Sequence, residues 1–221
     1  MIGETKLIQN VVIYGDSAFA EQAYNQIDSD DRYNVVAFTV DESKYNLNTF
    51  NQLPVIKFQQ LTKYYLPDDI IIFPAIGYSS SNKIREIVAQ DIICQGYELM
   101  TYISNRAFIG RNAVIGRGSY ICEFVSIGMK AKIGDCVIIL ANSSIAHDVV
   151  IENFSFLSHS VIVGGNAVIK HHAFVGLNAT VKDHVTVAEY NTVGAGANVI
   201  NNTFSNAIYV GNPAKIYKTL T

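Results

Sequence analysis

The five histidines of the 221-residue sequence all fall between residues 147 and 184. Three of them, His147, His159 and His171, are spaced twelve residues apart, and only His147 is followed directly by an acidic residue, Asp148. A neutral imidazole can accept a proton near pH 7, and a neighbouring carboxylate can orient the ring or stabilise the imidazolium that forms. The pair is therefore a candidate general base. The alternative is a solvated surface histidine.

The elements that position these histidines form a repeat. An aliphatic residue recurs at every sixth position from Ile103 to Val199, and the residue four places on is small or β-branched almost throughout, with Asn191 as the large exception. A period of six is no multiple of the helical 3.6 and is too long for strand alternation, so it describes a larger repeating unit. Residues 103–204 thus contain seventeen consecutive six-residue units.

One large and one small inward residue per short strand, with glycine common after the large one, predict an all-β triangular prism. Three units then form one coil, and residues 18 apart stack at the strand spacing of about 4.8 Å. We expect these ladders of aliphatic side chains to be the core. One predicted ladder consists of Ile103, Ile121, Ile139, Leu157, Val175 and Val193.

The phase of the histidines within this repeat places them outside the prism. His147, His159 and His171 each stand two places after the repeat aliphatic, and steps of twelve residues advance two faces out of three. The three side chains should therefore lie at different corners of one subunit, where they cannot converge. Three-histidine zinc sites of β-helix carbonic anhydrases need two histidines five positions apart, and no pair here has that spacing, so we expect no metal. We expect His171, His172 and His184 to be solvated corner residues.

The first hundred residues have a different pattern. Apolar runs at 7–14, 35–40, 70–75 and 98–103 alternate with helix-compatible stretches at 17–27 and 82–95. This order predicts a Rossmann-like α/β domain over residues 1–102, with a small parallel sheet.

Ligands of such sheets bind beyond the carboxyl ends of the strands. A dinucleotide fingerprint would need further glycines after Gly15, so NAD is not expected. Asp41 could accept a hydrogen bond from a ribose hydroxyl, although a solvated strand end explains it equally well. The candidate substrate-binding residues are Gly15, Asp16, Ser17, Asp41, Gly77 and Tyr78, with Glu42 next to them.

The hexapeptide pattern of aliphatic, Gly, any two, small and any one resembles the left-handed β-helix of the hexapeptide-repeat acyltransferases. Together with a short N-terminal α/β domain and the closing Gly211-Asn212-Pro213-Ala214-Lys215, the whole sequence resembles the NeuD and PglD family of sugar acyltransferases. The resemblance implies a left-handed coil, a homotrimer, and acyl-CoA bound between adjacent prisms. It also implies acylation of a sugar, commonly at the 4-amino group of a UDP- or dTDP-linked 4-amino-4,6-dideoxyhexose.

The resemblance assigns roles to particular residues. It implies that His147 is the catalytic base and Asp148 its partner, while His159 either contacts the acyl oxygen or has a plain surface role. Some members have a second histidine where this sequence has Phe156, and the family's first loop often reads GxxGHAK, whereas residues 15–21 read GDSAFAE.

The residues expected to hold CoA are small residues of the later coils and residues of the tail. The alternative is that they are the repeat's own glycines and a solvated tail. These residues are Gly164, Gly165, Ala195, Gly196, Pro213 and Lys215.

Composition narrows the partners. At 49% apolar and 16% charged residues, the chain can bury a substantial core. A net charge of −3 argues against a broad basic surface for nucleic acid or anionic membranes. No apolar run approaches the roughly 18 residues of a membrane span, and the N-terminus lacks a signal peptide pattern, so we expect a cytoplasmic protein. Cys94, Cys122 and Cys136 are expected to be free thiols.

These expectations combine into an acetyl-CoA-dependent sugar N-acetyltransferase. Residues 1–102 would bind the nucleotide sugar, residues 103–204 would carry the base and the CoA groove, and the tail of residues 205–221 would close over the cofactor. Two alternatives remain open, namely O-acetylation of a sialic-acid-like sugar and a non-catalytic β-helix scaffold or binding protein.

Overall fold

The computed structural model of the protein describes residues 8–220, so Leu7, the first residue of the first predicted apolar run, lies outside them. The described chain divides into two compact units. One contains residues 8–77 and 87–100, and the other contains residues 78–86 and 101–220.

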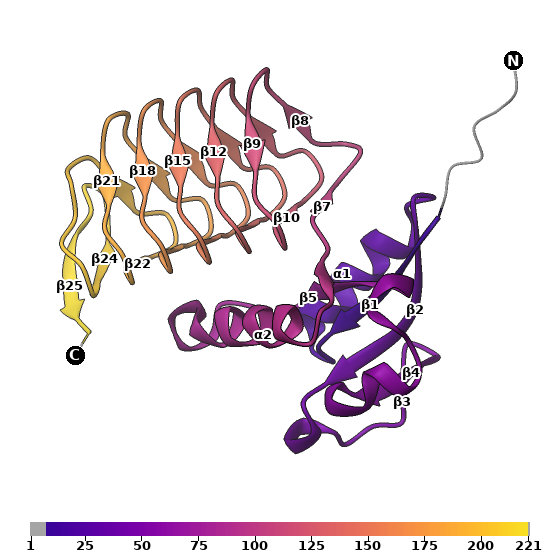
Figure 1. The fold of residues 1–221 in the computed structure, drawn as a ribbon. Coiled ribbons are helices and arrows are strands. Elements are labelled where there is room, and N and C mark those ends of the chain that lie inside the picture. Colours follow the sequence, from indigo (N-terminus) through magenta and orange to yellow (C-terminus); the bar gives the residue numbers. More distant parts are fainter. Residues whose placement is uncertain (1–7, 221) are drawn as a thin grey trace, which may run out of the picture. The chain divides into compact units, whose positions relative to one another are not determined.

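The first unit is built on a six-stranded sheet in the order β3-β4-β2-β1-β5-β6 (Figure 1). Five of these strands run parallel, which confirms the predicted α/β class. The middle of the sheet is apolar and buried, with Val11, Val12 and Ile13 of β1 fully covered. The strands are β1 (Gln9–Tyr14), β2 (Tyr33–Val40), β3 (Thr49–Phe50), β4 (Leu53–Lys57), β5 (Ile71–Pro74) and β6 (Glu98–Leu99).

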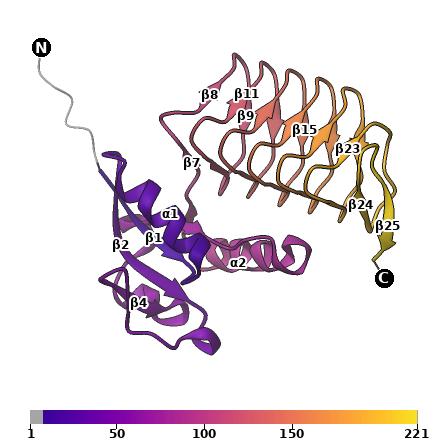
Figure 2. The same cartoon turned by 180° about the vertical axis from the view of Figure 1, so that it is seen from behind.

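The prediction of a purely parallel sheet is wrong at one edge, where β3 pairs antiparallel with β4. The two strands are joined by Asn51 and Gln52, whose φ angles of 48° and 66° are left-handed. The sequence analysis missed this hairpin because the β4 run is short and contains Pro54. Strand β4 lies between the edge strand β3 and β2, and Figure 2 shows it beside β2. Proline cannot donate to a ladder, and Pro54 comes before Val55, where the pairing with β2 begins.

Helix α1 begins after Ser17, whose hydroxyl accepts a hydrogen bond from the backbone N–H of Ala20 at 3.4 Å and so caps the helix. The predicted helical stretch 82–95 is largely α2. The helices are α1 (Ala18–Asp28) and α2 (Lys83–Cys94), with 3₁₀ turns η1 (Glu42–Lys44), η2 (Phe58–Lys63), η3 (Pro67–Asp69) and η4 (Ser79–Asn82).

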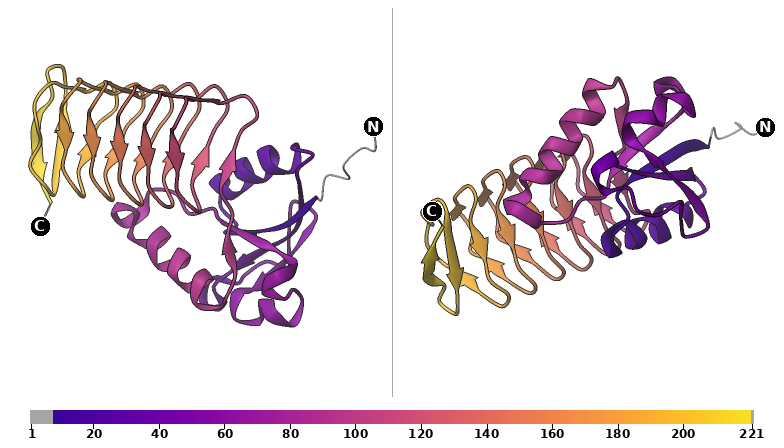
Figure 3. Two further views of the ribbon diagram at one scale, coloured as in Figure 1. Left: turned by 45° about the horizontal axis from the view of Figure 1, so that its top comes forward. Right: turned by 90° about the horizontal axis from the view of Figure 1, so that it is seen from below.

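The second unit is a parallel β-helix whose coils follow one another from β7 to the C-terminal hairpin (Figures 1 and 3). Its seventeen two-residue strands are β7 (Tyr102–Ile103), β8 (Phe108–Ile109), β9 (Val114–Ile115), β10 (Tyr120–Ile121), β11 (Ser126–Ile127), β12 (Lys132–Ile133), β13 (Ile138–Ile139), β14 (Ser144–Ile145), β15 (Val150–Ile151), β16 (Phe156–Leu157), β17 (Ile162–Val163), β18 (Val168–Ile169), β19 (Phe174–Val175), β20 (Thr180–Val181), β21 (Thr186–Val187), β22 (Thr192–Val193) and β23 (Asn198–Val199).

Each short strand pairs with the strand three further on, so residues 18 apart are in register, as predicted. This pairing produces three sheets, which form the sides of the prism. The first sheet contains β7, β10, β13, β16, β19 and β22, the second contains β8, β11, β14, β17, β20 and β23, and the third contains β9, β12, β15, β18 and β21. The tail extends the first sheet through β24 (Ala207–Val210) and β25 (Lys215–Thr219).

The turns at the corners share one backbone conformation. The third residue after each repeat aliphatic has a left-handed φ in fifteen consecutive turns, from Asn112 to Gly196. Asn, Gly, Asp and His tolerate this region, and β-branched residues do not. Asp148, with φ of 57°, and His172, with φ of 60°, both occupy this position. The backbone conformation of each corner residue is therefore set by its position in the repeat.

The inward polar residues of the prism are satisfied by the neighbouring coil. Ser143 Oγ donates to the carbonyl of Ser158 at 2.9 Å and accepts from the N–H of Val161 at 3.1 Å. Asn191, the large exception in the repeat, is fully buried and bridges the last coil to the tail. Its amide donates to Thr203 Oγ1 at 2.6 Å, and its carbonyl accepts from a β24 N–H at 3.0 Å.

The predicted free thiols are confirmed, because Cys94, Cys122 and Cys136 form no disulfide. Cys122 and Cys136 are buried in the prism, and Cys94 is exposed. Within residues 8–220, no helix is long and apolar enough to cross a membrane.

Candidate functional site

His147 lies in the turn after β14, at the corner between the second and third sheets. Its Nδ1 is 2.9 Å from Oδ2 of Asp148, and the two side chains are 57% and 42% exposed. When Nδ1 carries the proton and donates it to the carboxylate, the lone pair of the neutral ring is on Nε2. The structure therefore brings the predicted pair together and leaves a proton-accepting nitrogen at an open corner.

Gly165 makes room for the imidazole in the next coil. A Cβ atom on Gly165 would lie 2.8 Å from Nε2 and 2.9 Å from Cε1 of His147, so the ring occupies the space that any side chain would take. The neighbouring Gly164 faces the backbone of the following coil at Lys182 and Asp183 instead. The sequence analysis had assigned both glycines to CoA. The structure adds a contact between Gly165 and the candidate base.

The histidines occupy three different corners, as predicted. His147 follows a strand of the second sheet, His159 follows β16 of the first sheet, and His171 follows β18 of the third. The half-buried His159 therefore does not join His147 within one chain.

The expectation that His172 is a solvated corner residue is wrong. Its side chain is 4% exposed and lies between the rings of Phe154 and Tyr190, with centroid distances of 5.2 and 4.9 Å. Its Nε2 is 3.1 Å from Oε2 of Glu86, and its Nδ1 is 3.1 Å from Nδ1 of His171. Burial lowers the pKa of His172. The physical reason is that residues 78–86 pack over this corner, which the repeat alone does not reveal.

Arg85 holds this segment on the prism. Its buried guanidinium donates to the backbone carbonyls of Cys136, Phe154 and Ser155 at 3.0, 2.7 and 3.3 Å. Burial lowers its pKa to about 10. The sequence analysis did not single out Arg85, because a lone arginine in a helical stretch is usually a surface residue.

A cluster of aromatic side chains was also missed. The Tyr78 ring lies 5.3 Å from the Phe156 ring and 4.6 Å from the Phe174 ring. Phe156 and Phe174 stand 18 residues apart at the outward position of the first sheet, so the same 18-residue period could have revealed them. Phe174 borders a cavity of about 140 Å³ that is lined by Tyr78, Ser81, His172, Phe174, Tyr190, Asn191 and Thr192.

In the first unit, the carboxyl ends of β1, β2 and β5 are adjacent, because Tyr14 pairs with Thr39 and with Pro74. Gly15 follows with φ of 130°, and its N–H donates to the carbonyl of Thr39 at 2.8 Å. A Cβ on Gly15 would lie 3.0 Å from the carbonyl oxygen of Ala75, and the positive φ would strain any other residue, so both the contact and the backbone favour glycine here.

The other strand-edge candidates stand close to these ends in the chain. Asp16 and Ser17 follow Gly15 directly, and Gly77 follows β5 by three residues. Tyr78 is placed differently, since it belongs with the β-helix unit.

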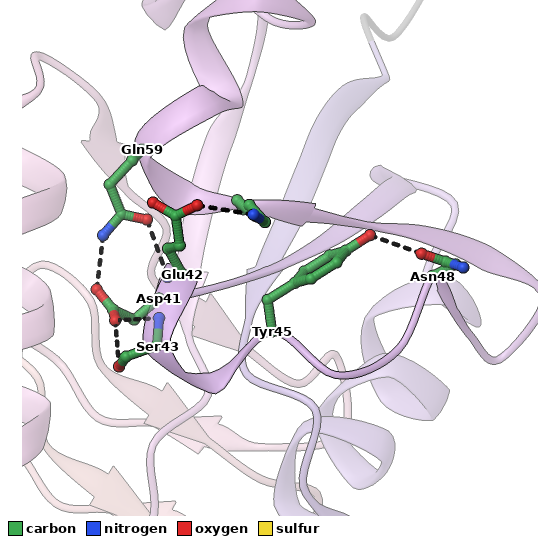
Figure 4. Close-up of polar contacts among 7 residues, drawn as sticks. Asp41, Glu42, Ser43, Tyr45, Asn48 and Gln59 are labelled. Atoms are coloured by element: carbon green, nitrogen blue, oxygen red, sulfur yellow. Dashed lines mark hydrogen bonds and ion pairs between the residues drawn. The ribbon is translucent and has the colours of Figure 1, made fainter.

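Asp41 follows β2 and is held by several donors (Figure 4). Its Oδ1 accepts from the N–H of Ser43 at 2.9 Å and from the Ser43 hydroxyl at 2.5 Å, and Oδ2 accepts from Gln59 at 2.6 Å. These hydrogen bonds, those from Ser43 first, lower the pKa of Asp41. A carboxylate has about four acceptor positions, so one remains for a ligand hydroxyl.

The candidate CoA residues of the last coil and tail lie close in the structure. Ala195 and Gly196 are exposed in the turn after β22. The backbone of Asn198 in β23 forms hydrogen bonds to both ends of the turn of residues 211–214 in the tail. The Asn198 N–H donates to the carbonyl of Gly211 at 3.0 Å, and its carbonyl accepts from Ala214 at 2.8 Å. Pro213 lies inside this turn and the exposed Lys215 follows it.

Within residues 8–220, no group of three or more histidine, cysteine, aspartate or glutamate side chains is arranged to hold a metal ion.

The fold and the His147 corner define an α/β domain followed by a hexapeptide-repeat β-helix. Residues 10–92 match the family model of the PglD N-terminal domain, and residues 100–193 match that of the GMPPB C-terminal domain. Residues 10–92 therefore form a PglD-type N-terminal domain, followed by a hexapeptide-repeat domain, as the sequence resemblance implied. No curated protein sequence matches the chain significantly.

Solved structures share the whole architecture. PerB from Caulobacter crescentus, solved with CoA and GDP-perosamine, is 24% identical with a TM-score of 0.86, covering 96% of this chain and 99% of PerB. The acetyltransferase domain of PglB from Neisseria gonorrhoeae is 22% identical with a TM-score of 0.84, covering 94% and 99%. WeeI from Acinetobacter baumannii is 25% identical with a TM-score of 0.82, covering 94% and 99%.

Proposed function

We propose that the protein is an acetyl-CoA-dependent N-acetyltransferase acting on a nucleotide-linked 4-amino-4,6-dideoxy sugar. The observation that carries this proposal is the His147 corner, where Asp148 orients the ring and Gly165 leaves space beside Nε2. The PglD-type N-terminal domain supports a nucleotide-sugar substrate. The likeness to PerB, solved with CoA and GDP-perosamine, and to the PglB domain, solved with acetyl coenzyme A, supports the chemistry.

In this reaction the sugar amine attacks the thioester carbonyl directly. The new C–N bond forms as Nε2 of His147 takes the proton from the amine, and the C–S bond then breaks. The CoA thiolate leaves and takes up the proton, so no covalent enzyme intermediate is needed. Asp148 stabilises the imidazolium that exists between the two proton transfers. Backbone N–H groups are suited to stabilise the tetrahedral oxyanion.

The two ligands are assigned to different parts of the chain. The nucleotide sugar would bind residues 1–102 through Gly15, Asp16, Ser17, Asp41 and Gly77, with its phosphates near the N-terminus of α1. Acetyl-CoA would run along residues 103–204 past Gly164, Gly165, Ala195 and Gly196, with Pro213 and Lys215 of the tail of residues 205–221 over it. In a homotrimer, His159 of a neighbouring prism would face the same groove.

The test is the replacement His147→Ala. Loss of the base should reduce kcat by about 10² to 10⁴-fold, the range expected for a general base. The affinity for CoA, measured by calorimetry, should change little because the imidazole acts on the amine.

The matched control is His184→Ala, which removes an exposed histidine at the same corner, two coils further along the prism than His147. Its activity should equal that of the unmodified protein. Near-normal turnover in His147→Ala would overturn the assignment. A panel of amino and hydroxy sugar nucleotides with acetyl-CoA would separate N-acetylation from O-acetylation, and the absence of any CoA binding would favour a scaffold.

A further inference from the structure

The segment of residues 78–86, which we call the strap, is held in a strained conformation. Ser80, Ser81 and Asn82 have φ angles of 51°, 51° and 62°, so three consecutive residues other than glycine are left-handed. Such residues persist only where the surrounding structure holds them in place. The strap is therefore a constrained element of the β-helix unit.

Side chains of the strap supply this constraint. Asn82 is fully buried, and its Nδ2 donates to the carbonyls of His172 and Ala173 at 3.2 and 3.4 Å. Arg85 donates to three carbonyls of the same corner, and Glu86 pairs with His172. The anchors thus lie at one end of the strap, and the position of its other end, Tyr78, depends on them.

Tyr78 forms one wall of the cavity of about 140 Å³ described above. Its ring packs against Phe156 and Phe174, yet the residue remains 59% exposed. The remaining lining includes two residues with hydroxyl groups, Ser81 and Thr192. Apolar walls with a few polar groups are typical of small-molecule subsites. This volume suits a single sugar ring or part of one, and it is too small for a nucleotide.

We propose that this cavity is the subsite for the acceptor hexose, and that Tyr78 and Phe174 contact an apolar edge of the sugar such as its deoxy methyl group. The inference rests on the proposed function and adds the part of the protein that selects the sugar. The strap residues Asn82, Arg85 and Glu86 are positioning residues that act through Tyr78.

The chemistry of the walls favours a deoxysugar over a fully hydroxylated one. A methyl group placed against the exposed edges of the Tyr78 and Phe174 rings loses no hydrogen bond to water, whereas a hydroxymethyl group there would lose one. Thr192 and Ser81 offer hydroxyls that can donate to or accept from the ring hydroxyls of the sugar.

The test compares Tyr78→Ala with Tyr78→Phe in the full-length protein, with GDP-perosamine and with UDP- and dTDP-linked 4-amino-4,6-dideoxyhexoses as probes. Tyr78→Ala should raise KM for the best sugar nucleotide about tenfold, while KM for acetyl-CoA changes less than about twofold. Tyr78→Phe keeps the ring and should raise that KM much less than Tyr78→Ala does. Thr192→Val, which preserves shape and removes a hydroxyl, should raise the same KM by about threefold or more.

Binding measurements separate the sugar from the nucleotide. In calorimetry, Tyr78→Ala should weaken binding of the sugar nucleotide and leave binding of the corresponding nucleoside diphosphate unchanged. If Tyr78→Ala weakened binding of the sugar nucleotide and of the nucleoside diphosphate equally, the inference would be overturned. An unchanged KM for the sugar nucleotide in both Tyr78→Ala and Thr192→Val would also overturn it. In either case, acetylation that depends on His147 would still support the proposed function. Failure of every amino sugar nucleotide to bind or to be acetylated by the unmodified protein would overturn both.

Discussion

Two neighbouring residues determine where the imidazole of His147 lies. Asp148 supplies a carboxylate at 2.9 Å from Nδ1, and Gly165, which has no side chain, leaves the room that the ring fills on the side of Nε2. The phase of the repeat predicts that His147 lies at an outer corner and that residue 165 stacks on it one coil later. It does not predict that the ring leans over Gly165, because that depends on the side-chain rotamer.

The contact between His147 and Gly165 predicts that a single added methyl group lowers turnover. In Gly165→Ala the new Cβ would overlap the ring, and the exposed imidazole would move away at little cost in stability. A misplacement of about 1 Å at a reacting group can lower turnover by up to about 100-fold, so we expect kcat to fall strongly with Tm nearly unchanged.

Gly164→Ala is the matched comparison, since a Cβ there would meet the backbone of the next coil at Asp183. That variant should lose thermal stability, measured by circular dichroism. Unchanged kcat in Gly165→Ala would contradict the role of Gly165.

At the scale of elements, buried polar side chains join the strap to one corner of the prism. The corner carries Phe154, His172 and Tyr190 at successive left-handed positions, where smaller residues are more common. Their rings cover the prism edge beneath the strap. The sequence predicts each corner position but not the strap, since the residues that cover His172 come from a segment some 86 positions earlier in the chain.

The buried His172 predicts a stability that depends on pH. Groups that face it are Glu86, which favours the charged ring, and His171 and Arg85, which disfavour it, and burial dominates and lowers the pKa. The unfolded chain therefore binds a proton at a higher pH than the folded chain does, and stability rises with pH in this window. Stability is fully present above the ordinary histidine pKa of about 6.5 and is lost as the pH falls through the lower folded value.

The comparison of Tm between pH 8 and pH 5 tests this. His172→Phe should show a smaller decrease in Tm toward pH 5 than the unmodified protein, because phenylalanine cannot take up a proton. The ring should fit this corner, since aromatic residues already occupy the equivalent positions 154 and 190. The exposed His184, changed to Asn, serves as the control and should leave the slope unchanged. An identical slope in His172→Phe would show that another group carries the pH dependence.

At the scale of the whole molecule, the corner arrangement limits what one β-helix can do. His147 lies at the corner between the second and third sheets, and this corner is opposite the first sheet, on which Tyr78 packs. A triangular prism cannot bring a corner to its opposite side. The proposed base and the proposed sugar subsite can therefore meet only between two copies, which agrees with the expected trimer.

This geometry predicts the mass of the assembly in solution and the activity of trimers mixed from two inactive variants. Light scattering should give three times the chain mass of 24.3 kDa. Trimers reassembled from a mixture of His147→Ala and Tyr78→Ala chains should recover part of the activity that each variant lacks alone, since some interfaces then combine an intact His147 with an intact Tyr78. A monomer, or mixed trimers no more active than the separate variants, would contradict the shared site.

The sequence-based predictions succeeded where one period controls the chain. The ladders, the seventeen strands and the separate histidine corners all follow from the six-residue repeat, because each coil repeats the contacts of the one before. The β3–β4 hairpin, the burial of His172 and the role of Arg85 were missed because each depends on contacts outside that period.

The strict pairing of residues 18 apart also restricts how the length of the prism can change. Removing one residue from a coil would rotate every later turn to another side and would place aliphatic side chains in solvent. Adding or deleting one whole coil would leave the in-register stacking on both sides unaltered. The prism can therefore grow or shrink only in whole coils of 18 residues, and single-residue insertions are tolerated only as loops that bulge outward at a corner.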